Sequence, residues 1–162
     1  MKSTLRWLLL LITIPVISLA LHAANEAPAT PPPDATWRQA ILGTWLHEKN
    51  VGVATVALYT TYHSDGTAIE LLKLKFLFKK PTGVWTEYRW HIENGALHLM
   101  PVRSRTNSDD TQVDMEETVR ELIRVDSTEL FFRRKGKERL EHRAAIPADV
   151  QKLIDELSQK QT

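Results

Sequence analysis

The sequence predicts an all-β protein with about eight antiparallel strands in an up-and-down meander that closes into a barrel or half-barrel, followed by a C-terminal amphipathic α-helix. Apolar segments with strand-like alternation follow one another with only short turns between them. Three of these turns contain Asn-Gly, Asp-Gly and Lys-Gly pairs. The apolar spacing becomes helical only near the C-terminus. Closure is expected because an open meander would leave two free edges.

Residues 1–24 are typical of a secretory signal peptide. Lys2 and Arg6 make the start basic, an almost wholly apolar run follows, and Ala20 and Ala23 are both acceptable cleavage sites. The apolar run is shorter than the roughly 18 to 20 residues of a spanning helix, so an uncleaved anchor is the weaker alternative. We therefore expect a periplasmic or secreted protein with no stable membrane insertion after cleavage.

Three further regions follow the leader. Residues 25–36, NEAPATPPPDAT, form a Pro/Ala-rich linker whose consecutive prolines favour extended polyproline geometry. Residues 37–145 have the length of one domain, and residues 146–162 contain the amphipathic helix.

Charge and cysteine content exclude several classes of function. The chain has 21 basic and 20 acidic residues, and removal of Lys2 and Arg6 with the leader leaves 19 and 20, a net charge of −1. A near-neutral chain lacks the basic footprint of a nucleic-acid binder. Without cysteine it has no disulfide, no thiol nucleophile and no lipid-modified cysteine, so we do not expect a lipoprotein.

The hairpin at residues 86–102 shows where the core lies. Its Asn94-Gly95 turn favours a two-residue type I′ loop, which pairs Glu93 with Ala96 and His91 with His98. Alternation then places an apolar group on one face, Tyr88, Trp90, Ile92, Leu97 and Leu99. The other face carries Glu87, Arg89, His91, Glu93 and His98.

A second hairpin joins residues 53–63 to residues 67–78. A two-residue loop at Asp65-Gly66 would place leucines opposite lysines. A three-residue loop with Gly66 in the left-handed position instead gives one apolar face, so we adopt it. The resulting pairs are Ala54–Phe76, Val56–Leu74, Leu58–Leu72, Thr60–Glu70 and Tyr62–Ala68.

The remaining elements follow from local signals. Asp34 can cap a short helix that ends at Ile41 or Leu42, before Gly43, and the first strand begins at Thr44-Trp45. Later strands are expected at residues 111–125, 129–134 and 138–144. In the first of these, Val119, Ile123 and Val125 share one phase and Leu122 has the other.

The C-terminal helix has one apolar stripe and must bury it. The stripe consists of Ile146, Val150, Leu153, Ile154 and Leu157. We expect it to pack on the outside of the sheet, against Tyr59, Ile69 and Leu71; docking on a partner protein is the alternative.

The order of several short motifs resembles the lipocalin-like domains of bacterial secreted proteins, which belong to the calycin group of β-barrels. The motifs are Gly43-Thr44-Trp45 after a short helix, the YHSDGT turn at 62–67, the WHIENGALHL hairpin at 90–99, the VDSTEL turn at 125–130, and Arg143. The resemblance implies that Arg143 packs across Trp45 in a structural cation–π contact. It also permits binding of a small ligand in the barrel.

The predicted inner face contains a few polar groups among apolar ones, which is the usual composition of a ligand pocket. The candidates are Thr60, Tyr62, Glu70, Tyr88, Trp90 and Arg103. The alternative is that Glu70 and Arg103 lie at the sheet's ends and reach water.

Two other groups of side chains are weaker candidates. His91 and His98 face each other closely enough to share a metal, with Glu93 or Glu87 as a third ligand, but the face is solvated and we expect no metal or cofactor. Residues 132–139, with Lys73, Lys75, Lys79 and Lys80, form either a positive patch for an anionic surface or a solvated sheet edge.

No recognisable catalytic constellation is present, so we do not expect an enzyme. The leading expectation is a periplasmic or secreted lipocalin-like protein that binds a small apolar or amphipathic molecule. The alternative is a protein-interaction module of the cell envelope, an assembly factor or inhibitor, that uses the sheet edge and the C-terminal helix.

Overall fold

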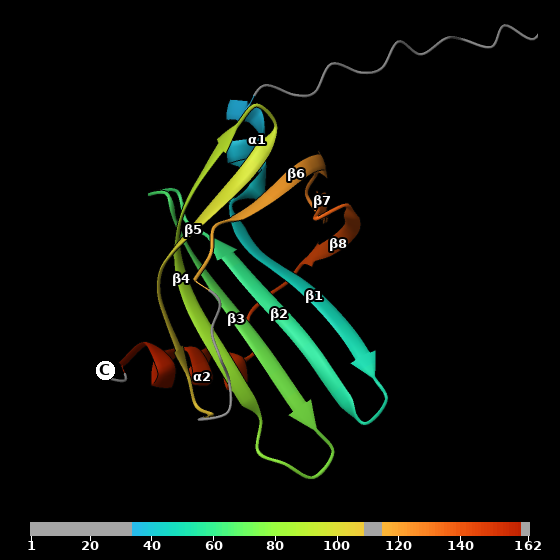
Figure 1. The fold of residues 1–162 in the computed structure, drawn as a ribbon, viewed down its shortest axis with the longest axis vertical. Helices are drawn as coiled ribbons and strands as arrows, with labels where there is room; N and C mark the ends of the chain where they lie inside the picture. Colours follow the sequence, from blue (N-terminus) through green and yellow to red (C-terminus); the bar gives the residue numbers. More distant parts are fainter. Residues whose placement is uncertain (1–33, 109–114, 160–162) are drawn as a thin grey trace, which may run out of the picture. The chain divides into compact units, whose positions relative to one another are not determined.

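The computed structural model describes residues 34–108 and 115–159. The expected signal peptide and most of the linker lie outside the described residues. Eight strands form a closed antiparallel barrel in chain order, with one helix before it and one after it, as the sequence predicts (Figure 1). The elements are α1 (Asp34–Ile41), β1 (Gly43–Val51), β2 (Ala54–Tyr62), β3 (Thr67–Phe76), β4 (Thr82–Glu93), β5 (Ala96–Thr106), β6 (Thr118–Val125), β7 (Glu129–Arg134), β8 (Lys137–Arg143) and α2 (Ala148–Gln159).

The β4–β5 hairpin has the predicted turn and register. Asn94 and Gly95 both have positive φ, at 52° and 77°, as a type I′ turn requires, and His91 pairs with His98. The Asp34 carboxylate accepts hydrogen bonds from both turn amides, each at 2.9 Å. The start of α1 is therefore fastened to this turn.

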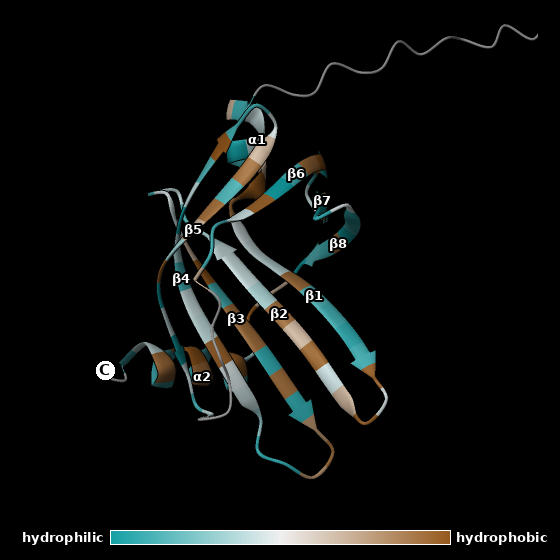
Figure 2. Ribbon diagram, viewed as in Figure 1, coloured by the Kyte–Doolittle hydropathy of each residue, from teal (hydrophilic) through white to brown (hydrophobic). Residues whose placement is uncertain are grey.

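The β2–β3 hairpin also follows the predicted register. All five expected pairs form, from Tyr62 with Ala68 to Ala54 with Phe76. Gly66 has a φ of 82°, the left-handed conformation expected for the last residue of a three-residue loop. Apolar bands alternate along β2 and β3 in Figure 2, in keeping with the pleat.

Two strands depart from simple alternation. In β5 the pairing skips Val102, so Tyr88 pairs with Pro101 while Glu87 pairs with Arg103. In β6 the pairing skips Ile123. A bulge inserts one residue into a strand and shifts the faces beyond it, which sequence alternation alone does not reveal.

The sixth strand is shorter than expected. The sequence predicted a strand that starts at Thr111. In the structure, β6 begins at Thr118, and residues 115–117 are not in a strand. The expected part at residues 111–114 lies outside the described residues. The bulge also separates Val125, which pairs with inward-facing Leu130, from Val119 and Ile123, which are exposed.

The first of two buried clusters fills the barrel at the end where α1 lies. Its side chains come from α1 and from strands β1 to β7: Trp37, Ile41, Trp45, Tyr62, Ala68, Tyr88, Trp90, Ile92, Leu97, Leu99, Leu122, Leu130 and Phe132. The aromatic face predicted for the β4–β5 hairpin is therefore confirmed as part of the core.

The second buried cluster lies on the outside of the barrel beneath α2. Val150, Ile154 and Leu157 pack against Tyr59 and Leu71, with Ile69, Leu153 and Ile146 at the margin, which confirms the predicted seat. Trp85, 2% exposed, is a further member that the sequence analysis did not assign. A Cβ added at Gly83 would lie 2.9 Å from Leu153 Cδ2, so this glycine permits the close approach of the helix.

Candidate functional site

The pairing that closes the barrel is short. β1 and β8 pair only at Trp45–Arg143 and Leu46–His142, and β5 pairs with β6 over residues 96–99. Strands β1 to β3 extend well beyond this region, away from α1 (Figure 1). The inner face of the extension is here called the open half.

Apolar side chains line the open half. They alternate with the residues that face α2 and share the face of Thr60 and Glu70: Val56, Leu58, Leu72, Leu74 and Val84. All five are half-buried. Within the described residues, neither of the two buried clusters includes them. They form apolar surface that the fold itself does not fully cover. On β1 the same face carries His47 and Lys49, which pair with Leu58 and Val56.

A buried ionic network separates the open half from the aromatic core. Arg120, 1% exposed, donates from Nη2 to Glu70 Oε2 at 2.8 Å and from Nη1 to Glu141 Oε1 at 3.2 Å and the Tyr62 hydroxyl at 3.1 Å. The guanidinium also lies 4.9 Å from the Phe132 ring centroid. Four strands, β2, β3, β6 and β8, therefore meet at one cation.

The two acids of this network differ in burial. Glu141 is fully buried, and desolvation raises the pKa of its carboxyl in spite of the nearby Arg120 guanidinium. The pKa of Tyr62 is also raised, chiefly by burial. Glu141 Oε2 and Arg120 Nε have no hydrogen-bond partner within the described residues. The Glu70 side chain, in contrast, is 18% exposed.

Glu70 keeps capacity for one more hydrogen bond. Its Oε1 accepts from the Tyr88 hydroxyl at 3.3 Å, and its Oε2 accepts from Thr60 Oγ1 at 3.4 Å and from Arg120. A carboxylate offers about four acceptor positions, and contacts with the described part of the chain use three. The remaining acceptor position makes Glu70 the polar group that can accept a hydrogen bond from a molecule in the open half.

The predicted pocket residues have three different outcomes. Thr60, Tyr62, Glu70 and Tyr88 come together around the ionic network. Trp90 is a core residue, edge-on to Tyr62 with ring centroids 5.6 Å apart, and its Nε1 donates to the Thr67 carbonyl at 2.8 Å.

The placement of Arg103 on the inner face was wrong. The β5 bulge turns Arg103 to the outside, where its Nε donates to Glu87 Oε2 at 2.5 Å. Its guanidinium lies 5.1 Å from the Trp85 ring centroid, at the edge of the α2 interface.

The sequence analysis missed Arg120 and Glu141. The available signal for Arg120 was its position two residues before Leu122, since residues i and i+2 of a strand share a face. The available signal for Glu141 was its register opposite Leu130. Charged residues are rarely fully buried unless they are paired, and the partners became visible only with closure of the barrel.

Gly43, Trp45 and Arg143 form the contact that the family resemblance implied. The Arg143 guanidinium lies 4.2 Å from the Trp45 ring centroid, and its nitrogens donate to the carbonyls of Ala40, Leu42 and Ser127 at 2.7–2.9 Å. A Cβ at Gly43 would lie 2.6 Å from Arg143 Nη1. This contact joins α1, β1 and the β6–β7 turn, so its role is structural.

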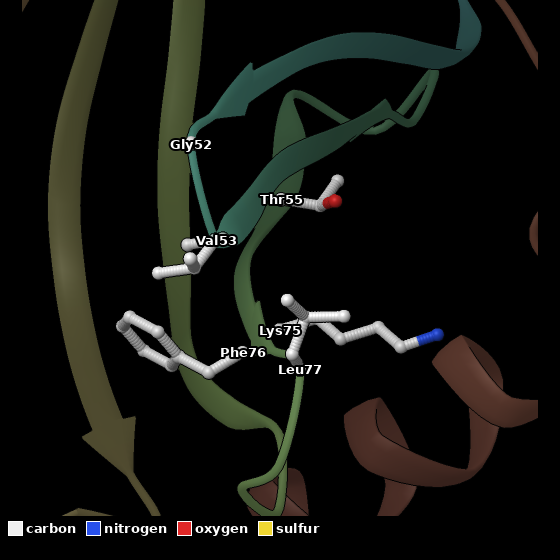
Figure 3. A pocket seen from close by; sticks show the side chains of 7 residues that line it. Gly52, Val53, Thr55, Lys75, Phe76 and Leu77 are labelled. Atoms are coloured by element: carbon white, nitrogen blue, oxygen red, sulfur yellow. The ribbon is translucent and has the colours of Figure 1, made fainter.

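Two turns form the far end of the open half. A hollow of about 400 Å³ lies between them, lined by residues 52–55 and 75–77. Figure 3 shows Val53 and Phe76 on one side of these turns and Thr55 and Lys75 on the other. The apolar inner face continues into this hollow, because Ala54 pairs with Phe76 directly after Val56 with Leu74.

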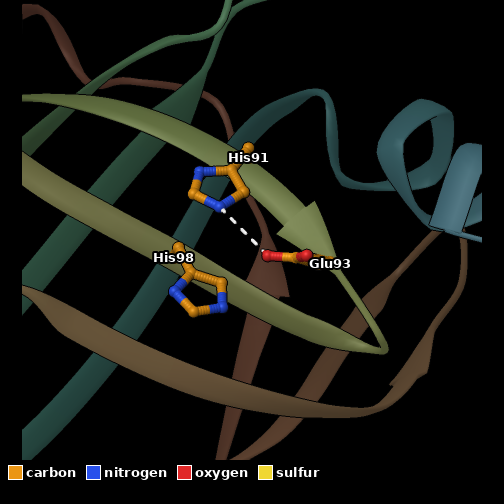
Figure 4. Close-up of side chains that lie close together, drawn as sticks. All are labelled: His91, Glu93 and His98. Carbon is orange, nitrogen blue, oxygen red and sulfur yellow. Dashed lines mark ion pairs between the residues drawn. The ribbon is translucent and has the colours of Figure 1, made fainter.

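His91, Glu93 and His98 form a separate cluster on the outer face of the β4–β5 hairpin (Figure 4). One ligand atom from each lies within 4.8 Å of the others. The two imidazoles are stacked with centroids 4.7 Å apart, and His98 Nδ1 lies 2.8 Å from Glu117 Oε1. The cluster offers three ligand groups, one fewer than a structural zinc site usually has.

Comparison with known proteins gives no assignment: the chain matches no family model and no curated protein. Within residues 34–108 and 115–159, no helix is both long enough and apolar enough to cross a membrane.

Proposed function

We propose that the protein binds an amphipathic small molecule in the open half of the barrel. The apolar part of the ligand lies along Val56, Leu58, Leu72, Leu74 and Val84, and its polar end reaches Glu70. The observation that carries this proposal is the row of five half-buried apolar side chains that ends at a partly exposed carboxylate. An apolar surface with a few polar groups at one end is the usual composition of a ligand site.

The polar end of the ligand is expected to be a hydrogen-bond donor. Glu70 has one acceptor position left, and Thr60 and Tyr88 direct their hydroxyl protons at the same carboxylate. Glu70 is the partly exposed acid of the network, so the network presents a hydrogen-bond acceptor to the open half. A long-chain amine or alcohol fits this end better than a fatty acid does.

A periplasmic or secreted location is part of the proposal and rests on the pattern of residues 1–24. The rival function, a protein-interaction module, relied on the sheet edge and on the apolar stripe of α2. Val150, Ile154 and Leu157 are instead buried on the barrel, which favours the ligand-binding proposal. We propose no catalytic role.

Fluorescence titration with the apolar probe N-phenyl-naphthylamine, followed by displacement, tests the proposal. We expect the probe to bind with enhanced emission and dodecylamine to displace it at a lower concentration than dodecanoate does. Leu72→Gln is expected to weaken probe binding by roughly tenfold, because it replaces apolar contact area with an amide.

Two controls make the test specific. Ile123→Gln changes an apolar residue on the outer face, 40% exposed, and should leave probe binding unchanged. Glu70→Gln should bring dodecylamine towards the potency of dodecanol. Equal probe binding by wild type and Leu72→Gln, with both folded by circular dichroism, would rule out the open half as the site.

A further inference from the structure

The two turns at the far end of the open half carry a cluster of exposed apolar side chains. The apolar tip, as we call it, consists of Val51, Val53, Phe76, Leu77 and Phe78. Their exposed fractions are 54%, 67%, 38%, 68% and 96%, in that order. The loop after β3 begins with an apolar stretch, brown in Figure 2, and continues with a hydrophilic one, in teal. Loops are normally polar, and contiguous exposed apolar residues mark interaction surfaces.

The tip is one surface although its residues come from two turns. The Leu77 amide donates to the Val53 carbonyl at 3.3 Å, which joins the β3–β4 loop to the β1–β2 turn. The shared hollow is lined by residues of both (Figure 3). Phe78, at 96% exposure, projects fully into solvent.

Basic side chains adjoin the tip. Lys49, Lys75, Lys79 and Lys80 are all exposed, and Glu48, also exposed, is the one acidic residue within residues 48–56 and 74–82. Within the described residues none of the four lysines forms an ion pair; Lys79 Nζ lies 6.0 Å from the Phe76 ring centroid. An apolar projection flanked by lysines is complementary to a surface with an apolar interior and an anionic rim.

We propose that the apolar tip inserts into the headgroup region of a bilayer that contains anionic phospholipid. Phe78, Leu77 and Val53 enter the boundary of the acyl chains, and the lysines contact lipid phosphates, their long stems lying along the apolar surface. Lysines near an anionic membrane contribute about 1 kcal/mol each. An apolar protein partner would leave these lysines without a counter-charge, so lipid is the occupant that the charge favours.

The proposal does not depend on ligand binding in the open half. It would explain why the apolar face of the open half runs without interruption into the apolar tip. The inner row from Leu58 and Leu72 through Val56 and Leu74 leads to Phe76 at the tip. A membrane-derived amphipathic molecule could pass along this row without crossing the outer, α2-covered face.

Vesicle co-sedimentation of the exported protein, with its N-terminus established by mass spectrometry, tests the proposal. We expect binding to vesicles of equal parts phosphatidylcholine and phosphatidylglycerol, and much less to phosphatidylcholine alone. The double variant Leu77→Ser, Phe78→Ser should lose binding to both. Lys79→Gln with Lys80→Gln should weaken binding to the anionic vesicles by roughly 30-fold and leave residual binding to neutral vesicles unchanged.

Matched controls show whether vesicle binding belongs to the tip. Met100→Ser with Ile123→Ser removes two exposed apolar residues away from the tip and should bind vesicles like wild type. All variants begin at the same residue, so any contribution of the N-terminal residues to vesicle binding is the same in every comparison. Leu72→Gln should keep vesicle binding even where it loses the fluorescent probe.

Three results would overturn the proposal. The first is equal binding of the tip double variant and wild type to anionic vesicles. The second is equal wild-type binding to neutral and anionic vesicles. The third is absence of vesicle binding together with self-association that Leu77→Ser, Phe78→Ser abolishes, because the tip would then be a contact between two copies of the chain.

Discussion

Arg120 and Glu70 form an ion pair inside the barrel, with Nη2 of the arginine 2.8 Å from Oε2 of the glutamate. The Arg120 side chain is 2% exposed and that of Glu70 is 18% exposed. The pair therefore connects the closed aromatic core with the open half. The same contact stabilises the fold and fixes the orientation of the group proposed to meet a ligand.

Removal of Arg120 is expected to be strongly destabilising. Arg120→Met leaves Glu141 buried without its cation, and loss of one partner of a buried ion pair costs about 3–5 kcal/mol of unfolding free energy. Urea denaturation measures the loss. Adding Glu70→Gln and Glu141→Gln to the same variant should restore part of it, because no uncompensated carboxylate remains. A loss below about 1 kcal/mol for Arg120→Met alone would contradict this account.

Glu141 should make stability depend on pH. Burial raises the pKa of its carboxyl in the folded state above the usual value of about 4.5, so the native protein binds more protons than the unfolded chain between those two pKa values. The contribution of Glu141 to the free energy of unfolding is therefore largest below about pH 4.5. It decreases as the pH rises from there through the higher pKa of the folded state.

Glu141→Gln provides the measurement, because other titrating groups cancel in the comparison with wild type. The variant's unfolding free energy minus that of wild type should increase as pH rises from acid to neutral. A difference that decreases would show that Arg120, not burial, dominates the ionisation of this carboxyl, and a constant difference would show that the two influences cancel.

The contact of Arg143 with Trp45 should be required for stability. Arg143→Met removes a cation–π contact and three charge-assisted hydrogen bonds, and we expect a loss of about 2 kcal/mol or more. Arg143→Lys should recover only a part, because one ammonium cannot reach three carbonyls arranged around a planar guanidinium.

Gly43→Ala should be destabilising by a related mechanism. The alanine Cβ would lie 2.6 Å from Arg143 Nη1, and the alanine backbone would have to adopt a φ of 105°. Thermal unfolding of the two single variants and the double variant forms a cycle. We expect Gly43→Ala with Arg143→Met to lose less than the sum of the single losses, and strict additivity would mean that the two residues do not interact.

The outer-face cluster is expected not to hold a stoichiometric zinc ion. His91, Glu93 and His98 supply three ligand groups on a solvated face, and His98 Nδ1 already contacts Glu117. Calorimetric titration with zinc should give the same small heat for wild type and His91→Ala. A saturable one-to-one heat that His91→Ala abolishes would identify a metal site here.

The sequence was most informative where a turn fixes the register. Asn94-Gly95 and Ser64-Asp65-Gly66 each determine one hairpin, and the pairs that follow from them are confirmed. The stripe on α2 was equally clear, because a helix that repeats apolar residues on one side must bury them. The signal-peptide, compartment and ligand assignments stay predictions.

The site was less predictable than the fold for two physical reasons. Bulges at Val102 and Ile123 change the face of the residues beyond them, and one of these bulges moved Arg103 to the outside. In addition, nothing in the local sequence marks Arg120 and Glu141 as buried, because charged residues are usually exposed. Only barrel closure, which brings β6 and β8 next to Glu70, supplies the partners that make their burial favourable. Local patterns do not contain such long-range pairing.

The measurement that tests the central claim most directly is a methyl NMR titration of the protein with dodecylamine. We predict saturable shifts at the methyl groups of Leu58, Leu72, Leu74 and Val84, with Leu153 and Leu157 beneath α2 unchanged. Shifts confined to Leu77 and its neighbours at the tip, or no saturable shift in the open half, would contradict the proposal that the open half is the ligand site.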